Sequence, residues 1–442
     1  MTLPRLREAH AHIAMHGRAL SLLRLDDCAS REQMLDRLAR AAASLAPGEW
    51  LLACGVRAES FTDEPRDGSR WPTRDELDAL LPARPCAVMS FDHHAVLANT
   101  AAFRAAGIDD GAPNPPGGVI VRDPRTASPT GLLLESAAWM AWLAAPEPDE
   151  TQRRSHVRAA LADLASHGFV EIHDLKSPVW LGPVLRELAD AGDLHATVWL
   201  YPLLDDLDAT LASAPSWEIP DRLLLAGAKV FADGTLNSRT AHTLTPFAHP
   251  IPDHPHGKAL LTPADLRAAI ARTQAAGIGL AVHAIGDAAV RDVLDAWEAS
   301  PGARAARASP WHASARHDTP TLRIEHAELL DARDVPRFAD LGVVASVQPC
   351  HLLTDIEVLE REFPDRLERV LPLRELIKAG CAPGALLWFG SDVPIVRPHP
   401  HDSLQAAVHR RRAADPPARA IAPTQALRES EAWACFAPSQ QG

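Results

Sequence analysis

Residues 278–299 read IGLAVHAIGDAAVRDVLDAWEA and contain the two patterns from which the fold can be inferred. The first seven residues form an apolar run that ends just after His283, as expected for a buried strand. Residues 286–299 then carry apolar side chains at helical spacing. A strand that is followed at once by a helix is the repeating unit of a parallel sheet.

The same alternation recurs along the chain and predicts an α/β protein. Apolar runs typical of strands lie at 8–13, 169–174, 196–202, 226–232, 278–284, 322–326, 342–348 and 387–392. Segments with helical spacing lie between or beside them, at 31–45, 152–167, 264–276, 286–299 and 331–340. About eight strand–helix units favour a (β/α)8 TIM barrel. An open doubly wound sheet is the alternative, but it usually has a glycine-rich phosphate-binding turn after an early strand, which this sequence lacks.

The stretch 14–168 is too long for one strand–helix unit. It contains two further apolar runs, at 50–56 and 86–91, and a run rich in proline and glycine at 111–118. We interpret it as a large insertion after the first strand that folds over the carboxyl-terminal mouth of the barrel. The predicted organisation is therefore one barrel domain over 1–442 with a cap at 14–168.

The composition limits the class of protein. The 442 residues are 47% apolar and 23% charged, as in a globular protein with a large core, and the net charge of −13 argues against binding to nucleic acid. No apolar run reaches the roughly 18 residues that span a membrane, and the first eight residues do not resemble a signal peptide. The six cysteines are scattered and form no CxxC pair. We therefore expect a cytoplasmic protein that acts on a small molecule.

Six polar residues lie at the ends of expected strands, where barrel enzymes place their catalytic groups. His10 and His12 share one face of the first strand because they are two positions apart. The other candidates each end a separate apolar run and are Lys229, His283, His326 and Asp392. Taken singly, each has a structural alternative, such as a cap or a lysine that reaches solvent. Imidazole and carboxylate groups together at successive strand ends favour a site for one or two divalent ions.

The ordered set resembles that of the amidohydrolase superfamily, and within it the amidohydrolase 3 branch, which includes YtcJ-like proteins and N-substituted formamide deformylases. In the expected barrel, the resemblance rests on REAHAHI (7–13), AGAKVFADGTLNSRTAHTLTPF (226–247), AVHAIGDAAVRDVLDAWE (281–298), RIEHAELLDARDVPRFADLGVVASVQPCHLLTD (323–355) and FGSDVPIVRPHPHDSLQAAVHR (389–410). In the insertion it rests on CAVMSFDHHAVLANTAAFRAAGI (86–108) and SPTGLLLESA (128–137). The resemblance therefore extends over essentially the whole chain.

The resemblance implies a role for each candidate. The deeper of two ions would be held by His10, His12 and Asp392, and the outer one by His283 and His326. Lys229 would bridge both as a carbamate formed with CO₂, because an ammonium group cannot bind a cation. Zn²⁺ is the expected ion, since it brings the pKa of bound water to about 7. The resulting hydroxide would attack a carbonyl carbon, and Asp392 would carry the proton to the leaving amine.

Further polar residues in the cap motif or near strand ends are candidates for substrate contacts: His94, Asn99, Asp233, Arg239 and His351. A hydrogen-bonded structural role is the alternative for each of them.

The sequence departs from the family pattern at its two ends. Family members have several strands before the HxH pair and more after the aspartate helix, and these strands form a small β-sandwich. Here the pair stands at the start, and the chain ends soon after PTQALRESEAWACF (423–436). We therefore expect the flanking β-sandwich to be missing and the barrel surface to be repacked or buried by a second copy in a homo-oligomer. Glu8 occupies the position of the family's aspartate before the HxH pair.

The predicted function is hydrolysis of a non-peptide C–N bond in a small molecule by a metal-activated hydroxide. Another reaction of the same centre, such as ester or lactone hydrolysis or decarboxylation, is one alternative. A catalytically degenerate barrel that acts as a binding protein is the other.

Overall fold

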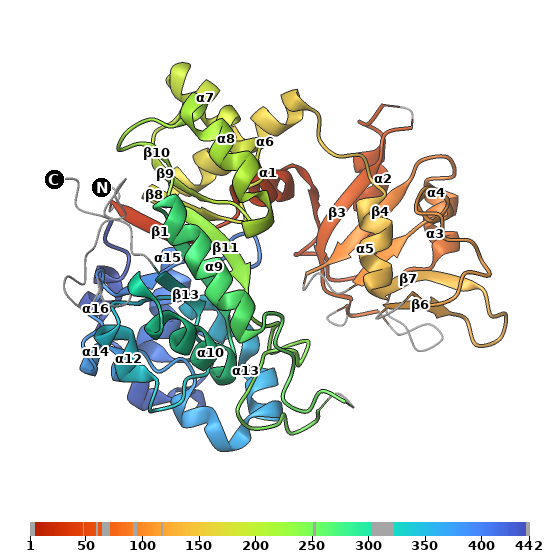
Figure 1. Ribbon diagram of the computed structural model, residues 1–442. Helices are drawn as coiled ribbons and strands as arrows, with labels where there is room; N and C mark the ends of the chain where they lie inside the picture. Colours follow the sequence, from red (N-terminus) through yellow and green to blue (C-terminus); the bar gives the residue numbers. More distant parts are fainter. Residues whose placement is uncertain are drawn as a thin grey trace. The chain divides into compact units, whose positions relative to one another are not determined.

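The computed structural model describes residues 5–46, 48–58, 61–63, 71–91, 95–115, 118–250, 253–302 and 322–438. The chain divides into two compact units (Figure 1): unit 1 comprises Met1–Gly17 and Arg154–Gly442, and unit 2 comprises Arg18–Arg153. The chain passes from one unit to the other within helices α1 (Ile13–Ser21) and α6 (Glu150–Ser166). In sequence, unit 2 lies inside the segment 14–168 that we interpreted as an insertion.

Unit 1 contains two parallel sheets. The first has the order β1 (Leu6–Ala11), β8 (Phe169–Leu175), β9 (Thr197–Tyr201), β10 (Leu223–Leu225). The second has the order β11 (Gly227–Phe231), β12 (Gly279–Ala284), β13 (Leu322–His326), β14 (Val344–Val347), β15 (Leu387–Phe389). Each strand segment expected from the sequence overlaps one of these strands, so the α/β class is correct, whereas the strand pairing records two sheets rather than one closed barrel.

Backbone hydrogen bonds connect the two sheets on both sides. On one side the amide of Asp392 donates to the carbonyl of His10 over 2.8 Å, beside a bridge between Ala11 and Val393. On the other side the amide of Lys229 donates to Pro202 over 2.7 Å. Each sheet therefore continues into the other through backbone contacts rather than ending at a free edge on these two sides.

The remaining helices of unit 1 are α7 (Leu181–Asp190), α8 (Leu207–Trp217), α9 (Pro263–Ala276), α10 (Asp287–Glu298), α12 (Val335–Asp340), α13 (Leu352–Glu362), α14 (Leu373–Lys378), α15 (Pro400–Leu404) and α16 (Glu429–Ala434). Local sequence explains where they begin and end. In α9, Thr262 and Asp265 form a reciprocal capping box and Gly277 ends the helix with a left-handed φ of 69°. In α10, Val290, Val293 and Trp297 are buried at helical spacing, and α9 and α10 pack beside β11 and β12 (Figure 1).

Unit 2 is built on one six-stranded mixed sheet. Its order is β2 (Leu23–Arg24), β3 (Leu51–Val56), β4 (Cys86–Ser90), β5 (Ala95–Ala98), β7 (Pro129–Glu135), β6 (Gly118–Arg122). Side chains alternate between the two faces of β4, so Val88 joins a core with α2 (Arg31–Ala42) and α3 (Arg74–Leu80). Met89 joins the other core, with α4 (Thr100–Ala105) and α5 (Ser136–Leu143). Both faces of this sheet are therefore covered by helices of the same unit.

None of the helices in the described parts of the chain is long and apolar enough to cross a membrane.

Close packing between α7 and α8 generates a first prediction. A Cβ atom added at Gly182 would lie 2.5 Å from the indole of Trp217, which is fully buried. Helix propensity alone predicts that Gly182→Ala stabilises the protein by about 1 kcal/mol. Because the added methyl group has no room, we expect a loss of about 1–3 kcal/mol instead, measured as the free energy of unfolding in urea. The double variant with Trp217→Phe should recover part of this loss, and a stabilised single variant would contradict the packing argument.

Candidate metal centre

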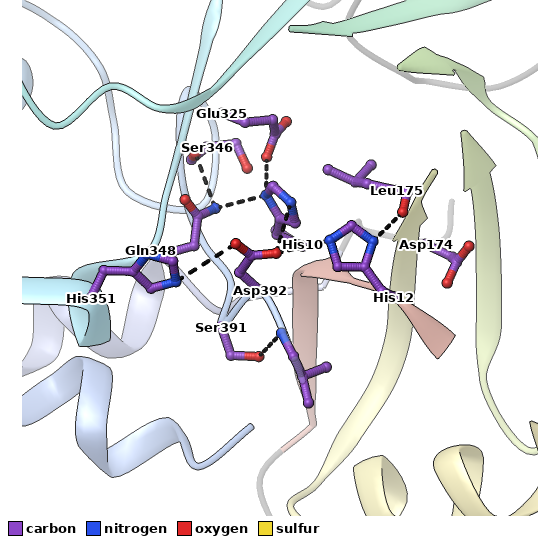
Figure 2. Close-up of polar contacts among 12 residues, drawn as sticks. His10, His12, Asp174, Leu175, Glu325, Ser346, Gln348, His351, Ser391 and Asp392 are labelled. Carbon is purple, nitrogen blue, oxygen red and sulfur yellow. Dashed lines mark hydrogen bonds and ion pairs between the residues drawn. The ribbon is translucent and has the colours of Figure 1, made fainter. Parts of the chain in front are cut away.

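Two histidines and an aspartate converge where β1 and β15 end. The Nε2 atom of His12 lies 2.9 Å from Oδ1 of Asp392, and Nε2 of His10 lies 3.3 Å from the same oxygen (Figure 2). One potential ligand atom from each residue lies within 4.8 Å of the others. The backbone bond between Asp392 and His10 holds the two strand ends in this register. The structure thus brings together the residues that the sequence assigned to the deeper ion.

Polar contacts on the far side of each imidazole fix the orientation of the two rings. Nδ1 of His12 contacts the carbonyl oxygen of Leu175, whereas Nδ1 of His10 lies 2.8 Å from Oε2 of Glu325 and 3.1 Å from Nε2 of Gln348 (Figure 2). A histidine that donates from Nδ1 keeps the lone pair of Nε2 free. Both rings therefore offer Nε2 toward Asp392, which is the arrangement by which outer carboxylates and carbonyls orient metal-binding histidines.

A fully buried arginine on β13 supports this arrangement. Arg323 is ion-paired with Glu325 and donates to Oγ of Ser346 over 2.8 Å. Another nitrogen of its guanidinium group lies 2.7 Å from Nδ1 of His173, and the group also contacts the carbonyl of Ala9. The sequence analysis missed Arg323 and Glu325, although two charged residues two positions apart in an apolar strand were a signal of a buried pair.

The other three predicted ligands lie close to this group, and two of them carry buried atoms without hydrogen-bond partners. Lys229 Nζ and His326 Nδ1 are buried and have no hydrogen-bond partner. The ring of His326 lies 4.5 Å from that of His283 and 5.0 Å from that of His10, measured between ring centroids. Nε2 of His283 donates to the carbonyl of Gly234 over 3.0 Å, which leaves Nδ1 of this ring as the acceptor.

Burial keeps the candidate histidine ligands neutral, as metal binding requires, and shifts the pKa of Lys229 toward the neutral amine. It lowers the pKa values of His10 and His326 well below the ordinary value and that of His283 to about 4, so these rings are neutral. It lowers the pKa of Lys229 to about 8. Burial by itself would raise the pKa of Asp392, but its attraction to His10 and its hydrogen bond with His12 hold it below the ordinary range.

His351, which we predicted to contact the substrate, lies beside one of the candidate metal ligands. Its Nε2 lies 3.8 Å from Oδ2 of Asp392 (Figure 2), and this nitrogen has no hydrogen-bond partner. Two further groups of potential ligand atoms include it, one with His326 and Asp392 and one with Glu328 and Asp355. The sequence analysis did not single out Glu328 or Asp355, because each becomes a candidate only through neighbours on other elements.

Asp233 has a structural explanation for its position. Its carboxylate accepts the amides of Ile285 (3.0 Å), Gly286 (2.8 Å) and His242 (2.9 Å), so it fixes the start of α10 and the loop after β11. Burial raises the pKa of Asp233 to about 7, although these hydrogen bonds oppose the shift. One oxygen of this carboxylate also lies 3.5 Å from Nε2 of His283.

The remaining predicted substrate contacts form hydrogen bonds with the backbone or lie outside the described residues. In unit 2, Asn99 caps α4 and bonds to backbone groups of Cys86, Leu81 and Arg84, which accounts for its position. Arg239 follows β11 and donates to the carbonyl of His249 over 2.9 Å. His94 lies outside the described residues.

The comparisons with known proteins first define the class of fold. An uncharacterized metal-dependent hydrolase from Pyrococcus horikoshii has a similar fold, with a TM-score of 0.73 and 24% identity over 97% of this chain and 78% of that one. A family model described as "Amidohydrolase family" matches residues 1–440. This chain therefore belongs to the amidohydrolase family, a family of hydrolases.

Two curated relatives agree with this assignment. The putative amidohydrolase YtcJ of Bacillus subtilis is 28% identical over 92% of this chain and 73% of its own length. The N-substituted formamide deformylase of Arthrobacter pascens is 26% identical over 97% of this chain and 77% of its own length. The similarity to the amidohydrolase 3 branch that the sequence motifs indicated is thus confirmed.

The contact between Glu325 and His10 generates a second prediction. Glu325→Gln should weaken Zn²⁺ binding about 10–100-fold, because the neutral amide no longer orients and polarises the imidazole of His10. The affinity is measured by titration against a competing chelator, with circular dichroism as a check on folding. Glu362→Gln removes an equally buried carboxylate at the end of α13, and its affinity for Zn²⁺ should be unchanged. Equal affinities of the two variants would contradict the role of Glu325.

Proposed function

We propose that this protein is a metal-dependent amidohydrolase that cleaves a C–N bond other than a peptide bond in a small molecule. One observation carries the proposal: the ligand atoms of His10, His12 and Asp392 gather within 4.8 Å at the end of two neighbouring strands. Membership of the amidohydrolase family agrees with it. Zn²⁺ is the ion that we expect, because imidazole and carboxylate groups are among its preferred ligands.

We infer that the two sheets of unit 1 form one (β/α)8 barrel. The inference rests on the backbone hydrogen bonds that connect the sheets on both sides. Only Ala226 separates β10 from β11, so these two count as one barrel strand. In such a barrel the candidate ligands come from the carboxyl ends of several strands, where the active sites of this fold lie.

The buried atoms without partners fit a second ion. Lys229 Nζ and His326 Nδ1 lack hydrogen-bond partners in a part of the protein where water cannot supply them. A carbamate on Lys229 would supply two oxygens, and His283 would offer Nδ1 once Nε2 is bonded to Gly234. We therefore assign His283, His326 and carboxylated Lys229 to the outer ion, and His10, His12 and Asp392 to the deeper one.

The residues of the chain support hydrolysis in the following way. A bound divalent ion supplies a Lewis acid and lowers the pKa of a coordinated water. Asp392 is buried and ionised, so it can accept a proton from the attacking water and return it to the leaving nitrogen. Glu325 and Arg323 keep the ring of His10 in place while this happens.

The direct test uses the Zn²⁺-loaded protein with N-butylformamide as the probe and butyl acetate as the ester comparison. We expect formamide hydrolysis that is lost on treatment with a chelator and restored by Zn²⁺. Asp392→Asn should lower kcat at least about 100-fold, because it removes both a ligand and the proton acceptor. A protein that hydrolyses only the ester would contradict the assignment to C–N bonds, and one without bound metal would contradict the whole proposal.

Carboxylation of Lys229 can be tested separately from activity. Protein equilibrated with ¹³C-bicarbonate and Zn²⁺ is expected to show one carbamate carbon resonance, since ion binding and burial favour the anionic form. Lys229→Met should abolish this signal, whereas Lys258→Met at an exposed position should keep it. Absence of the signal from the unsubstituted protein would contradict the carbamate.

A further inference from the structure

A second cluster of polar side chains lies next to the candidate metal centre. Glu328 follows β13, His351 ends a short 3-10 turn after β14, and Asp355 lies in the first turn of α13. One nitrogen or oxygen of each lies within 4.8 Å of the others. The three residues are 7%, 9% and 6% exposed, so the cluster is nine-tenths buried. We call Glu328, His351 and Asp355 the acidic cluster.

The acidic cluster places two buried carboxylates close to one another. In the described parts of the chain, no arginine or lysine forms an ion pair with Glu328 or Asp355. The charged groups that face Glu328 are the carboxylates of Asp355, Asp233 and Asp392. Burial and these neighbouring carboxylates raise the pKa of Glu328 well above its ordinary value, because a second buried negative charge is unfavourable. A cation bound between Glu328 and Asp355 would favour the ionised form of both groups.

Most of the acceptor atoms of the cluster are also free. The carboxylate of Glu328 accepts no hydrogen bond from the residues that the structure describes. Asp355 accepts a hydrogen bond from the side-chain amide of Asn237 over 2.8 Å and another from the side chain of Thr354. Nε2 of His351 has no partner. A buried polar atom without a partner costs free energy, so Nε2 of His351 favours a partner supplied from outside the chain.

We propose that the acidic cluster binds a primary ammonium group on the substrate. An ammonium group has three N–H donors, and the cluster offers one acceptor on each of three side chains. Acceptors that surround a tetrahedral ammonium at ordinary hydrogen-bond lengths are about 4.7 Å apart, and the three acceptor atoms of the acidic cluster lie no more than 4.8 Å from one another. A third divalent ion would fit this position less well, because it would lie beside the ions that we assign to the centre.

The position of His351 determines how far the ammonium group of the substrate lies from the bond that is cleaved. Its Nε2 is 3.8 Å from Asp392, so the acidic cluster adjoins the residue that we assign to proton transfer. This step rests on the proposed function, because only that function puts the scissile bond at Asp392. The substrate class is then a small amide that carries a primary ammonium group a few bonds from the scissile C–N bond.

The test compares two formamides of nearly equal shape, N-(3-aminopropyl)formamide and N-butylformamide. The first ends in an ammonium group where the second ends in a methyl group. We expect kcat/KM of the Zn²⁺-loaded protein to be at least tenfold higher for the aminopropyl compound. Glu328→Gln and Asp355→Asn should each lower this preference at least tenfold, because each replaces a charged acceptor by an amide. The matched control Glu362→Gln, on the same helix as Asp355, should keep the preference. Equal rates for both formamides, or a preference that neither variant changes, would overturn the proposal.

A binding measurement keeps the proposal testable without turnover. Calorimetric titration of the Zn²⁺-loaded protein should detect n-butylammonium but not 1-butanol, with at least tenfold weaker binding in Glu328→Gln. If this holds while neither formamide is hydrolysed, the subsite stands and the proposed function fails. If N-butylformamide is hydrolysed but butylammonium does not bind, the subsite fails and the function stands. A further Zn²⁺ ion that disappears in Glu328→Gln would identify the cluster as a metal site and overturn the proposal.

Discussion

The buried ion pair between Arg323 and Glu325 holds the candidate metal centre together. Arg323 is completely inaccessible to solvent, so its donors have to be satisfied by the protein. They contact Glu325 on its own strand, side chains on β8 and β14, and a backbone carbonyl of β1. Glu325 in turn contacts His10, so one guanidinium group links four strands to a candidate metal ligand. Removal of one partner of such a pair costs about 3–5 kcal/mol because the other charge remains buried.

The second constraint lies in the backbone at two strand ends. His326 and Asp392 adopt left-handed conformations, with φ of 72° and 63°, which few residues other than glycine adopt. Such conformations cost about 1–3 kcal/mol each and persist where surrounding contacts determine them. At Asp392 the amide bond to His10 is one of these contacts. Both residues are candidate ligands, so the strain occurs where the chain turns a side chain toward the centre.

Much of this arrangement could be predicted from the sequence, for identifiable reasons. Strands buried on both faces leave continuous apolar runs, and most of the expected ligands stand near the end of one, as His283 does, whereas Lys229 lies in the middle of β11. The prediction of strand 387–392 was too long, because β15 ends at Phe389 and Asp392 is not extended. Supporting contacts could not be predicted, since Arg323 finds its partners on strands that lie far away in the sequence. The acidic cluster could not be predicted for the same reason, because only the fold brings Glu328 and Asp355 close to His351.

The central claim is that His10, His12 and Asp392 bind a divalent ion. Diffraction data from crystals of the Zn²⁺-loaded protein, collected on both sides of the zinc absorption edge, test it most directly. The account predicts an anomalous peak within bonding distance of Nε2 of His10, Nε2 of His12 and a carboxylate oxygen of Asp392. Zinc bound at full occupancy elsewhere, with these three side chains still hydrogen-bonded to one another, would contradict it.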